Sequence, residues 1–342
     1  MRRQKRLLRR VYGYSRGFPM PRLTALALDR ANEWVVRWRL GGRLPTHPGD
    51  SVVDYLRELD HQVHPQPASL RPLAPREAGP FMFEADSPWP QAVGRNARWR
   101  AERRVPEVSG GGQAPALILL HGWLVERPQL VIYRHWARRA AARGLDVWMP
   151  RLPYHLERAD PGEISGERCL SPDLRTSLDA VRQAVAETRL LARWLRASGA
   201  PAVGIWGMSL GGWVAALATS LDADWEGVAM WAPVAAPAEV LFESGLVELM
   251  RDAVVAGGGL AEDFDAPEMA AITPALRRGL VPRSRVLMVA GAYDQVVSPR
   301  SVARLARAWN VDVRWVPHGH ISLMASRAPV ELTAGFLASV LR

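Results

Sequence analysis

The sequence predicts an α/β fold in which a mostly parallel central sheet is covered by helices on both faces. Two observations lead to this prediction. From residue 115 onward, short apolar runs alternate with longer stretches of helical periodicity, a pattern typical of a buried parallel sheet. Within that region, an apolar run beginning at Val203 leads through Gly207-Met208-Ser209-Leu210-Gly211 into the helix-favouring stretch 213–218. This arrangement is typical of a sharp strand-to-helix turn that exposes a serine hydroxyl.

The length and composition suit one large domain with additions. The chain has 342 residues, of which 48% are hydrophobic, and no apolar run approaches the ~18 residues needed to span a bilayer. A single cysteine, Cys169, excludes an internal disulfide framework and is expected to be a small, partly buried thiol. The basic start is not followed by a long apolar stretch, so we expect no signal peptide and a cytoplasmic protein.

The first 22 residues are strongly basic, within a chain of net charge +10. They contain no acid and eight basic residues, namely Arg2, Arg3, Lys5, Arg6, Arg9, Arg10, Arg16 and Arg22. Such a cluster either attracts an anionic membrane surface or the phosphates of nucleic acid, or is a solvated tail. No nucleic-acid-binding motif accompanies the charge, so nucleic acid is not an expected partner.

Residues 1–80 are expected to form an N-terminal extension. An amphipathic helix is predicted over 23–42, ending at Gly41-Gly42, with one stripe formed by Leu23, Leu26, Ala27, Arg30, Trp34 and Trp38. A second helix is predicted over 51–64, with Ser51 as its N-cap, before a Pro-rich linker from Pro65 to Pro80. We expect the extension to pack on the main domain; the alternative places 1–40 on an anionic membrane with both tryptophans at the interface.

Residues 81–342 are expected to form the main domain. Extended segments are predicted at 81–85 and 96–104, the second as an antiparallel edge strand. The remaining predicted strands are 116–120, 145–150, the apolar run that begins at Val203, 227–231, 285–290 and 311–316, and the predicted helices are 132–143, 173–198, 299–309 and 329–341. The apolar insert 237–282, which includes Phe242, interrupts this alternation and predicts a helical cap that excludes water and shapes a substrate pocket.

Polar residues follow three of the predicted strands, where sites form in open α/β sheets. They are His121 and Trp123 after 116–120, Asp294 after 285–290, and His318 and His320 after 311–316. A serine becomes nucleophilic when an imidazole accepts its proton and a carboxylate orients that imidazole. Ser209, Asp294 and a following histidine occur in the Ser…Asp…His order of one particular fold.

The oxyanion formed during acyl transfer needs preorganised N–H donors. Leu210, directly after the serine, can supply one from the start of its helix, and Trp123 is best placed to supply another. His121 is expected to brace the loop that carries Trp123. Tyr154 and His155 follow the second strand of the alternating region and are expected either to line the pocket or only to form the turn.

These motifs resemble the α/β-hydrolase superfamily over about residues 81–342. The resemblance implies nucleophile Ser209, acid Asp294, base His320, and an oxyanion hole at Trp123 and Leu210. His320 directly follows a glycine, as the final histidine of the family usually does, which favours it over His318 as the base. The stretches Phe83…Ser87-Pro88, Pro153-Tyr154-His155 and 207–212 are similar to the α/β-hydrolase domain-containing 18 branch, which implies lipid or acyl-ester chemistry.

The sequence therefore predicts a serine hydrolase that cleaves a small-molecule or lipid carboxylic ester through an acyl-enzyme. No metal is expected, because His47, His61 and His64 lack metal-ligand spacing, and no cofactor, because Gly110–Gly112 lacks the lysine and helix of a phosphate loop. Alternatives are an acyltransferase or thioesterase with the same triad, a peptidase, or a non-catalytic binding protein on the same scaffold. The complete Ser-His-Asp set argues against the last.

Overall fold

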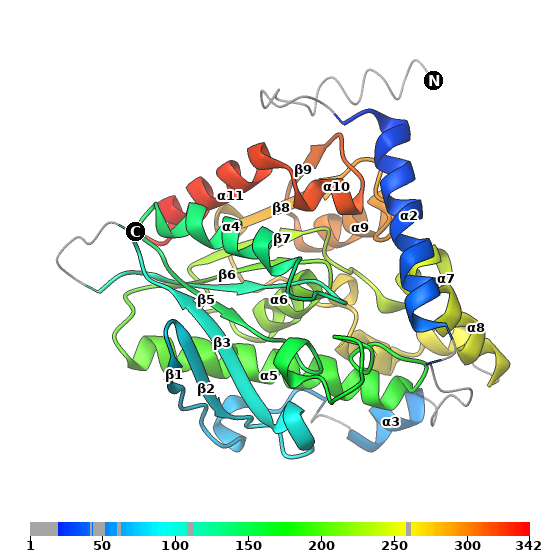
Figure 1. Ribbon diagram of the computed structural model, residues 1–342, viewed down its shortest axis with the longest axis horizontal. Coiled ribbons are helices and arrows are strands. Elements are labelled where there is room, and N and C mark those ends of the chain that lie inside the picture. Colours follow the sequence, from blue (N-terminus) through cyan, green and yellow to red (C-terminus); the bar gives the residue numbers. More distant parts are fainter. Residues whose placement is uncertain (1–19, 42, 44–51, 60–62, 108–112, 258–260) are drawn as a thin grey trace.

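A twisted sheet runs through the centre of the molecule (Figure 1). The computed structural model describes residues 20–41, 43, 52–59, 63–107, 113–257 and 261–342. Within these residues, nine strands form one sheet in the order β1-β2-β3-β5-β4-β6-β7-β8-β9. The strands are β1 (Arg76–Gly79), β2 (Met82–Asp86), β3 (Arg98–Arg104), β4 (Ala116–Leu120), β5 (Asp146–Pro150), β6 (Val203–Met208), β7 (Gly227–Trp231), β8 (Val286–Gly291) and β9 (Val313–Val316).

The strands from β5 to β9 are parallel, and β1, β2 and β3 form an antiparallel edge. Every residue of β4, β5, β6 and β7 is buried, as expected for parallel strands with helices on both faces. The mostly parallel α/β sheet predicted from the sequence is confirmed.

Two helical layers cover the sheet (Figure 1). The covering helices are α4 (Leu130–Ala141), α5 (Leu174–Ala197), α6 (Leu210–Leu221), α9 (Pro299–Trp309) and α11 (Arg327–Val340). Helix α4 packs with α11, and α5 packs with α6. Between α4 and the sheet, Trp136 stacks on Trp206 of β6 with ring centroids 4.8 Å apart, and Trp231 of β7 lies beside both rings. These large buried rings fix α4 against the strand that leads into the predicted strand-to-helix turn.

The sheet begins earlier in the chain than predicted. Strand β1 lies inside the Pro65–Pro80 stretch that was predicted to be a linker, and it pairs with β2. As a result β3, predicted to be the edge strand, instead lies between β2 and β5. All four residues of β1 are exposed, so the strand carries no apolar alternation from which the sequence could reveal it.

The N-terminal helices are α2 (Arg22–Leu40) and α3 (Val52–Leu59). Helix α3 buries Val52 and Leu56 in the same core as the sheet. Helix α2 lies along one side of the molecule, against the short helix α10 (His320–Met324) and the turn η5 (Gly245–Val247) (Figure 1). The predicted packing of this extension on the main domain is therefore observed for both helices, whereas Ser51 and residues 1–19 lie outside the described part of the chain.

The face that α2 buries differs from the predicted stripe. Its buried residues are Ala25, Asp29, Glu33, Val36 and Leu40. Leu23, Trp34 and Trp38, predicted as members of the apolar stripe, are 80%, 68% and 73% exposed. The prediction failed because two of the buried residues are acids, which can be buried only with hydrogen-bonding partners, and the donors to Asp29 come from distant parts of the chain.

The insert between β7 and β8 forms the expected helical cap. It contains α7 (Pro237–Glu243), η5 and α8 (Glu248–Ala256), and Leu241, Val247, Met250 and Val254 of these elements form a small apolar cluster of their own. The short 3-10 turns are η2 (Pro67–Ser69), η3 (Gly94–Ala97), η4 (Leu156–Arg158), η5, η6 (Ala261–Asp265), η7 (Pro267–Ala271), η8 (Pro274–Leu276) and η9 (Arg283–Arg285). Across the described ranges, every helix is too short or too polar to cross a bilayer.

Candidate active site

Ser209 occupies a strained turn between β6 and α6. Its backbone angles are φ 56° and ψ −115°, a region that non-glycine residues adopt only when the surrounding structure enforces it. Both flanking glycines are required by close backbone contacts. A Cβ atom on Gly207 would lie 2.1 Å from the carbonyl oxygen of Gly211, and one on Gly211 would lie 2.5 Å from that of Leu120. The turn therefore presents the Ser209 side chain at the carboxyl end of the sheet.

Ser209, His320 and Asp294 form a continuous hydrogen-bonded chain. Nε2 of His320 lies 3.0 Å from Oγ of Ser209, and Nδ1 lies 2.8 Å from Oδ2 of Asp294. Since the carboxylate can only accept, the proton is assigned to Nδ1, which leaves Nε2 able to accept the serine hydroxyl proton. The other carboxylate oxygen of Asp294 accepts the N–H groups of Val296 and Val297, each at 2.8 Å. Both His320 and Asp294 are buried.

The environment of His320 favours its protonated form. Burial lowers the pKa of His320, but the negative charge and hydrogen bond of Asp294 raise it, and the charge of Asp29 raises it further. The net result is a pKa above the ordinary value of 6.5. This is the electrostatic arrangement that a general base requires, because an imidazolium formed during reaction is stabilised in place.

The alternative base, His318, is placed differently. Its Nδ1 has no hydrogen-bond partner among the described residues, and burial lowers its pKa. Its main-chain carbonyl accepts the N–H of Tyr293 at 3.0 Å. His318 thus supports the loop that carries Asp294 through its backbone, while the side chain joined to Ser209 is that of His320.

Two backbone N–H groups can form an oxyanion hole beside Ser209. Leu210 is the first residue of α6, and Trp123 lies in the loop after β4. No partner is recorded for the N–H of either residue within the described ranges. The loop comes close to the serine, since a Cβ atom on Gly122 would lie 3.7 Å from Cβ of Ser209. Unpaired donors next to a nucleophile can stabilise a developing oxyanion.

The loop that carries Trp123 is held by two buried histidines. Nε2 of His121 accepts the N–H of Leu152 at 3.1 Å, and Nε2 of His155 accepts the N–H of Leu124 at 3.2 Å. Burial lowers both pKa values, that of His155 to about 4, so both rings are neutral. The bracing role expected of His121 thus extends to His155.

Tyr154 and His155 do not line the cavity beside Ser209, although lining was one of the two expectations for them. His155 is fully buried behind the loop of Trp123. The Tyr154 ring lies beneath the guanidinium of Arg168, 5.0 Å from its centroid. Both residues belong to the turn that supports the site, which was the other expectation.

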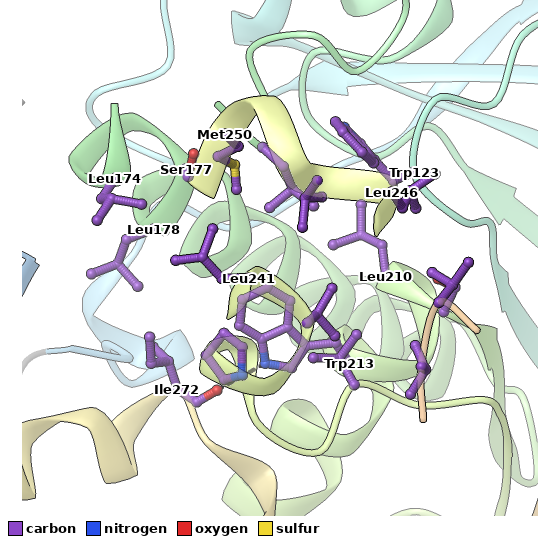
Figure 2. Close-up of a pocket in the computed structure, with 18 of the residues that line it drawn as sticks. Trp123, Leu174, Ser177, Leu178, Leu210, Trp213, Leu241, Leu246, Met250 and Ile272 are labelled. Carbon is purple, nitrogen blue, oxygen red and sulfur yellow. Dashed lines mark hydrogen bonds between the residues drawn. The ribbon is translucent and has the colours of Figure 1, made fainter. Parts of the chain in front are cut away.

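The cavity beside Ser209 is apolar. It has a volume of about 100 Å³, and Figure 2 shows side chains of α5, α6 and the cap pointing into it. Its lining includes Leu174, Leu178, Trp213, Leu241, Leu246, Val247, Met250, Phe264 and Ile272. Ser177 also lines it, but its hydroxyl is bonded to the backbone of Ser171, and the ring N–H of Trp213 donates to Ile272. The hydroxyl of Ser209 therefore borders a cavity in which the side-chain polar groups of Ser177 and Trp213 are already hydrogen-bonded.

Phe242, expected to shape the pocket, stands one layer behind the lining. Its ring packs edge-on against Phe264, with ring centroids 5.4 Å apart, and Phe264 is the residue that lines the cavity. The predicted position on α7 was therefore close, but the residues of that helix that line the cavity are Pro237, Val240 and Leu241.

Two other residues noted in the sequence are buried core residues. Nε2 of His64 lies 2.9 Å from the carbonyl oxygen of Ala271, and burial lowers its pKa to about 3. Cys169 is buried, which raises its pKa to about 12. Among the described residues, no group of three His, Cys, Asp or Glu side chains is arranged to hold a metal ion. His47, His61 and Gly110–Gly112 lie outside those ranges.

The structure adds one residue to the site that the sequence did not suggest. Asp29 of α2 is completely buried and accepts the backbone N–H of His320 at 2.9 Å. It also accepts the N–H groups of Gln295 and Ile321, at 3.1 and 3.0 Å. These partners lie more than 260 positions away in the chain, so no local pattern links them to Asp29.

Comparison with known proteins gives two distant relatives by sequence. No protein-family model matches the chain. Two proteins of Mycobacterium tuberculosis, from strains CDC 1551 / Oshkosh and H37Rv and both described as uncharacterized, are 30% identical over 245 residues. The match covers 70% of this chain and 56% of each relative, so the chain spans about half the length of the curated relatives it matches.

Solved structures resemble most of the chain. An esterase from Pseudomonas putida ECU1011 superposes with a TM-score of 0.51 at 15% identity, covering 96% of this chain and 99% of the esterase. Brefeldin A esterase, described as a bacterial homologue of human hormone sensitive lipase, gives a TM-score of 0.50 at 17% identity, with 91% and 93% coverage. At these identities the likeness establishes the fold alone, and that fold is the α/β-hydrolase fold expected from the sequence.

Proposed function

We propose that this protein is a serine hydrolase that cleaves a carboxylic ester with an apolar acyl group. One observation carries the proposal. The hydroxyl of Ser209 is hydrogen-bonded to His320, His320 is hydrogen-bonded to Asp294, and the same hydroxyl borders an apolar cavity. A serine, an imidazole and a carboxylate joined in this order are the groups that acyl transfer requires.

In the first half of the proposed reaction, Ser209 Oγ attacks the ester carbonyl carbon while Nε2 of His320 takes the hydroxyl proton. The tetrahedral oxyanion accepts hydrogen bonds from the N–H groups of Leu210 and Trp123. Asp294 stabilises the imidazolium, keeping its own negative charge. When the intermediate collapses, the bond to the alcohol oxygen breaks, Nε2 returns its proton to that oxygen, and the acyl group remains on Ser209.

In the second half, water takes the place of the alcohol. Nε2 of His320 removes a proton from the water as its oxygen attacks the acyl carbon. Collapse of the second tetrahedral intermediate breaks the bond to Ser209 Oγ, which recovers its proton from His320. The products are a carboxylic acid and the original enzyme, so atoms and charge balance without any further reactant.

The substrate class is inferred from the cavity. Its lining side chains are almost entirely aliphatic or aromatic, and the polar groups of Ser177 and Trp213 are already paired. An acyl chain can be buried there without stranding a polar atom. Lipid or acyl-ester chemistry also agrees with the resemblance to the α/β-hydrolase domain-containing 18 branch. That branch and a cytoplasmic location remain predictions.

The proposal is tested with a series of p-nitrophenyl esters from acetate to palmitate. We expect turnover that increases from acetate to a medium or long chain, because added methylene groups enter the apolar cavity. A chain-length series of acyl thioesters, assayed in parallel, distinguishes an esterase from a thioesterase. Absence of turnover across both series, with folded protein, would contradict the hydrolase assignment.

A further inference from the structure

We propose that Asp29 of helix α2 is a positioning residue that holds the His320 and Asp294 loops in register with Ser209. This inference rests on the proposed function, because it assigns Asp29 to the support of the same three residues. It also makes the N-terminal extension part of the active-site framework, although the motifs of the site all lie beyond residue 120.

The carboxylate of Asp29 joins the two loops directly. Oδ2 accepts the N–H of His320 at 2.9 Å and that of Gln295, the neighbour of Asp294, at 3.1 Å. Oδ1 accepts the N–H of Ile321 at 3.0 Å. One side chain thus links the residue after Asp294 to the start of α10, where His320 lies. With three donors, the buried carboxylate is well compensated for the loss of water.

The main chain around Asp29 is shaped for this carboxylate. A Cβ atom on Gly319 would lie 2.6 Å from Oδ2 of Asp29, so a side chain at that position would displace the carboxylate. The backbone of Gly319 has a φ of −87°, which any residue can adopt. Glycine is therefore needed here for the space that Asp29 occupies.

Asp29 acts on His320 in two ways. Its three hydrogen bonds fix the main chain from which the imidazole projects, and a misplacement of about 1 Å at a reacting group can lower the rate ~10²-fold. Its negative charge also contributes to the raised pKa of His320, after the larger effects of burial and Asp294. Removal of that charge should therefore lower the pKa of His320.

The variant Asp29→Asn tests both effects. The amide directs an N–H₂ group toward backbone donors, so we expect kcat for a short ester to fall about 10- to 100-fold with little change in KM. In a plot of kcat/KM against pH, the acid limb, where activity is lost as pH falls, should move to lower pH. Glu33→Gln is the matched control, because Glu33 is a buried acid on the same face of α2 but is paired with Arg30. Its acid limb should stay at the wild-type pH.

The test of Asp29 can fail independently of the test of serine hydrolase activity. Turnover and fluorophosphonate labelling of the wild-type protein test whether it is a serine hydrolase. NMR titration of the His320 imidazole tests Asp29 even without turnover, and should give a lower pKa in Asp29→Asn than in the wild type and Glu33→Gln. Wild-type kcat together with an unshifted His320 titration in folded Asp29→Asn would overturn the proposal.

A second variant keeps the test valid if Asp29→Asn does not fold. Gly319→Ala retains the charge of Asp29 but places a methyl group against its carboxylate. We expect Gly319→Ala to lower kcat. When Asp29 is already replaced by alanine, the same substitution should lower kcat less, because the carboxylate that the methyl group displaces is then absent. Full activity in Gly319→Ala would show that the contact does not position His320.

The opposite face of α2 carries an independent observation, from which we infer that this helix docks on an anionic lipid surface. Leu23, Trp34 and Trp38 lie on one stripe of the helix and are largely exposed. Leucine and tryptophan on one helix face suit the boundary between lipid headgroups and acyl chains. The eight basic residues of 1–22, with no acid among them, favour an anionic surface as the partner.

Vesicle co-sedimentation tests this docking surface. The full chain should bind phosphatidylcholine vesicles containing phosphatidylserine, bind pure phosphatidylcholine weakly, and dissociate as salt rises through physiological strength. Trp34→Ser combined with Trp38→Ser should lose binding while turnover of a soluble short ester is retained. Val131→Ser, at an exposed apolar residue of α4, is the control and should bind like the wild type.

Two results would overturn the lipid inference. One is equal sedimentation of the double tryptophan variant and the wild type. The other is a homodimer, detected by light scattering, that dissociates in the double variant while neither protein binds vesicles. That outcome would assign the exposed stripe to a second copy of this chain.

Discussion

Nε2 of His320 lies 3.0 Å from Oγ of Ser209, although the two residues are 111 positions apart in the chain. The sheet makes this contact possible, because β6 and the later strands are parallel and end at the same edge. The loops then determine the exact positions of the three side chains. Ser209 is held by a strained turn, Asp294 by two backbone N–H groups, and His320 by Asp294 and Asp29.

The identity of the base can be tested by comparing two histidine variants. We expect His320→Ala to lower kcat about 10⁴-fold or more, because the members of such a triad act as a unit. His318→Ala should have a mild effect, since the observed contribution of His318 is made by its main chain. Rates are measured with one soluble ester at matched protein stability. The reverse ranking would assign the base to His318.

The pH dependence of kcat/KM should follow the titration of His320. Only the neutral imidazole can accept the serine proton, so activity is lost as pH falls through the pKa of His320 in the free enzyme. Because that pKa is raised, the midpoint of the acid limb should lie above pH 6.5. Asp294→Asn should lower the midpoint as well as the rate. A wild-type midpoint well below pH 6.5 would contradict the electrostatic account of His320.

Chain-length preference should depend on the cavity wall contributed by the cap. Leu241 lines the cavity (Figure 2), so Leu241→Trp should reduce turnover of long-chain esters strongly and that of acetate little. The comparison variant is Phe242→Ala, which removes a ring packed behind Phe264 and should shift the preference less. A uniform loss across all chain lengths in Leu241→Trp, accompanied by a lower Tm, would instead indicate general damage to the core.

The stability of the turn η4, which follows His155, should depend on a buried ion pair with α5. Arg158 and Glu187 are both buried, and their closest charged atoms are 2.7 Å apart. Glu187→Ala leaves Arg158 buried without its carboxylate, which should reduce the free energy of unfolding by about 3–5 kcal/mol. Glu107→Ala, which removes an exposed partner of Arg104, should cost about 0–1 kcal/mol. Denaturant unfolding measures both, and equal losses would contradict the importance of the buried pair.

Much of the fold and of the Ser209 site could be predicted because the signals are local. Gly207 and Gly211 flank Ser209 in one short stretch, and the buried strands of the parallel sheet are short apolar runs that can be recognised directly. Asp294 and His320 each follow a strand, so a parallel sheet brings their loops to one edge. The hydrogen bonds among the three residues could not be measured from the sequence, but their proximity could be expected.

The features that were missed depend on long-range contacts. Asp29 of α2 was not among the predicted site residues, because a buried acid needs hydrogen-bond donors and its donors lie in loops far along the chain. The exposed tryptophans of the same helix looked like its buried face, since apolar periodicity does not say which side is covered. His155 could be placed near the site, but its support of the N–H of Leu124 depends on how two loops meet.

The most direct test of the central claim is covalent labelling with a fluorophosphonate probe. The account predicts that the wild-type protein reacts in a single position, that peptide mapping assigns the label to Ser209, and that Ser209→Ala loses both labelling and ester turnover by a factor of the order of 10⁴. Retention of turnover in folded Ser209→Ala, or a label mapped to another residue, would contradict the assignment of Ser209 as the nucleophile.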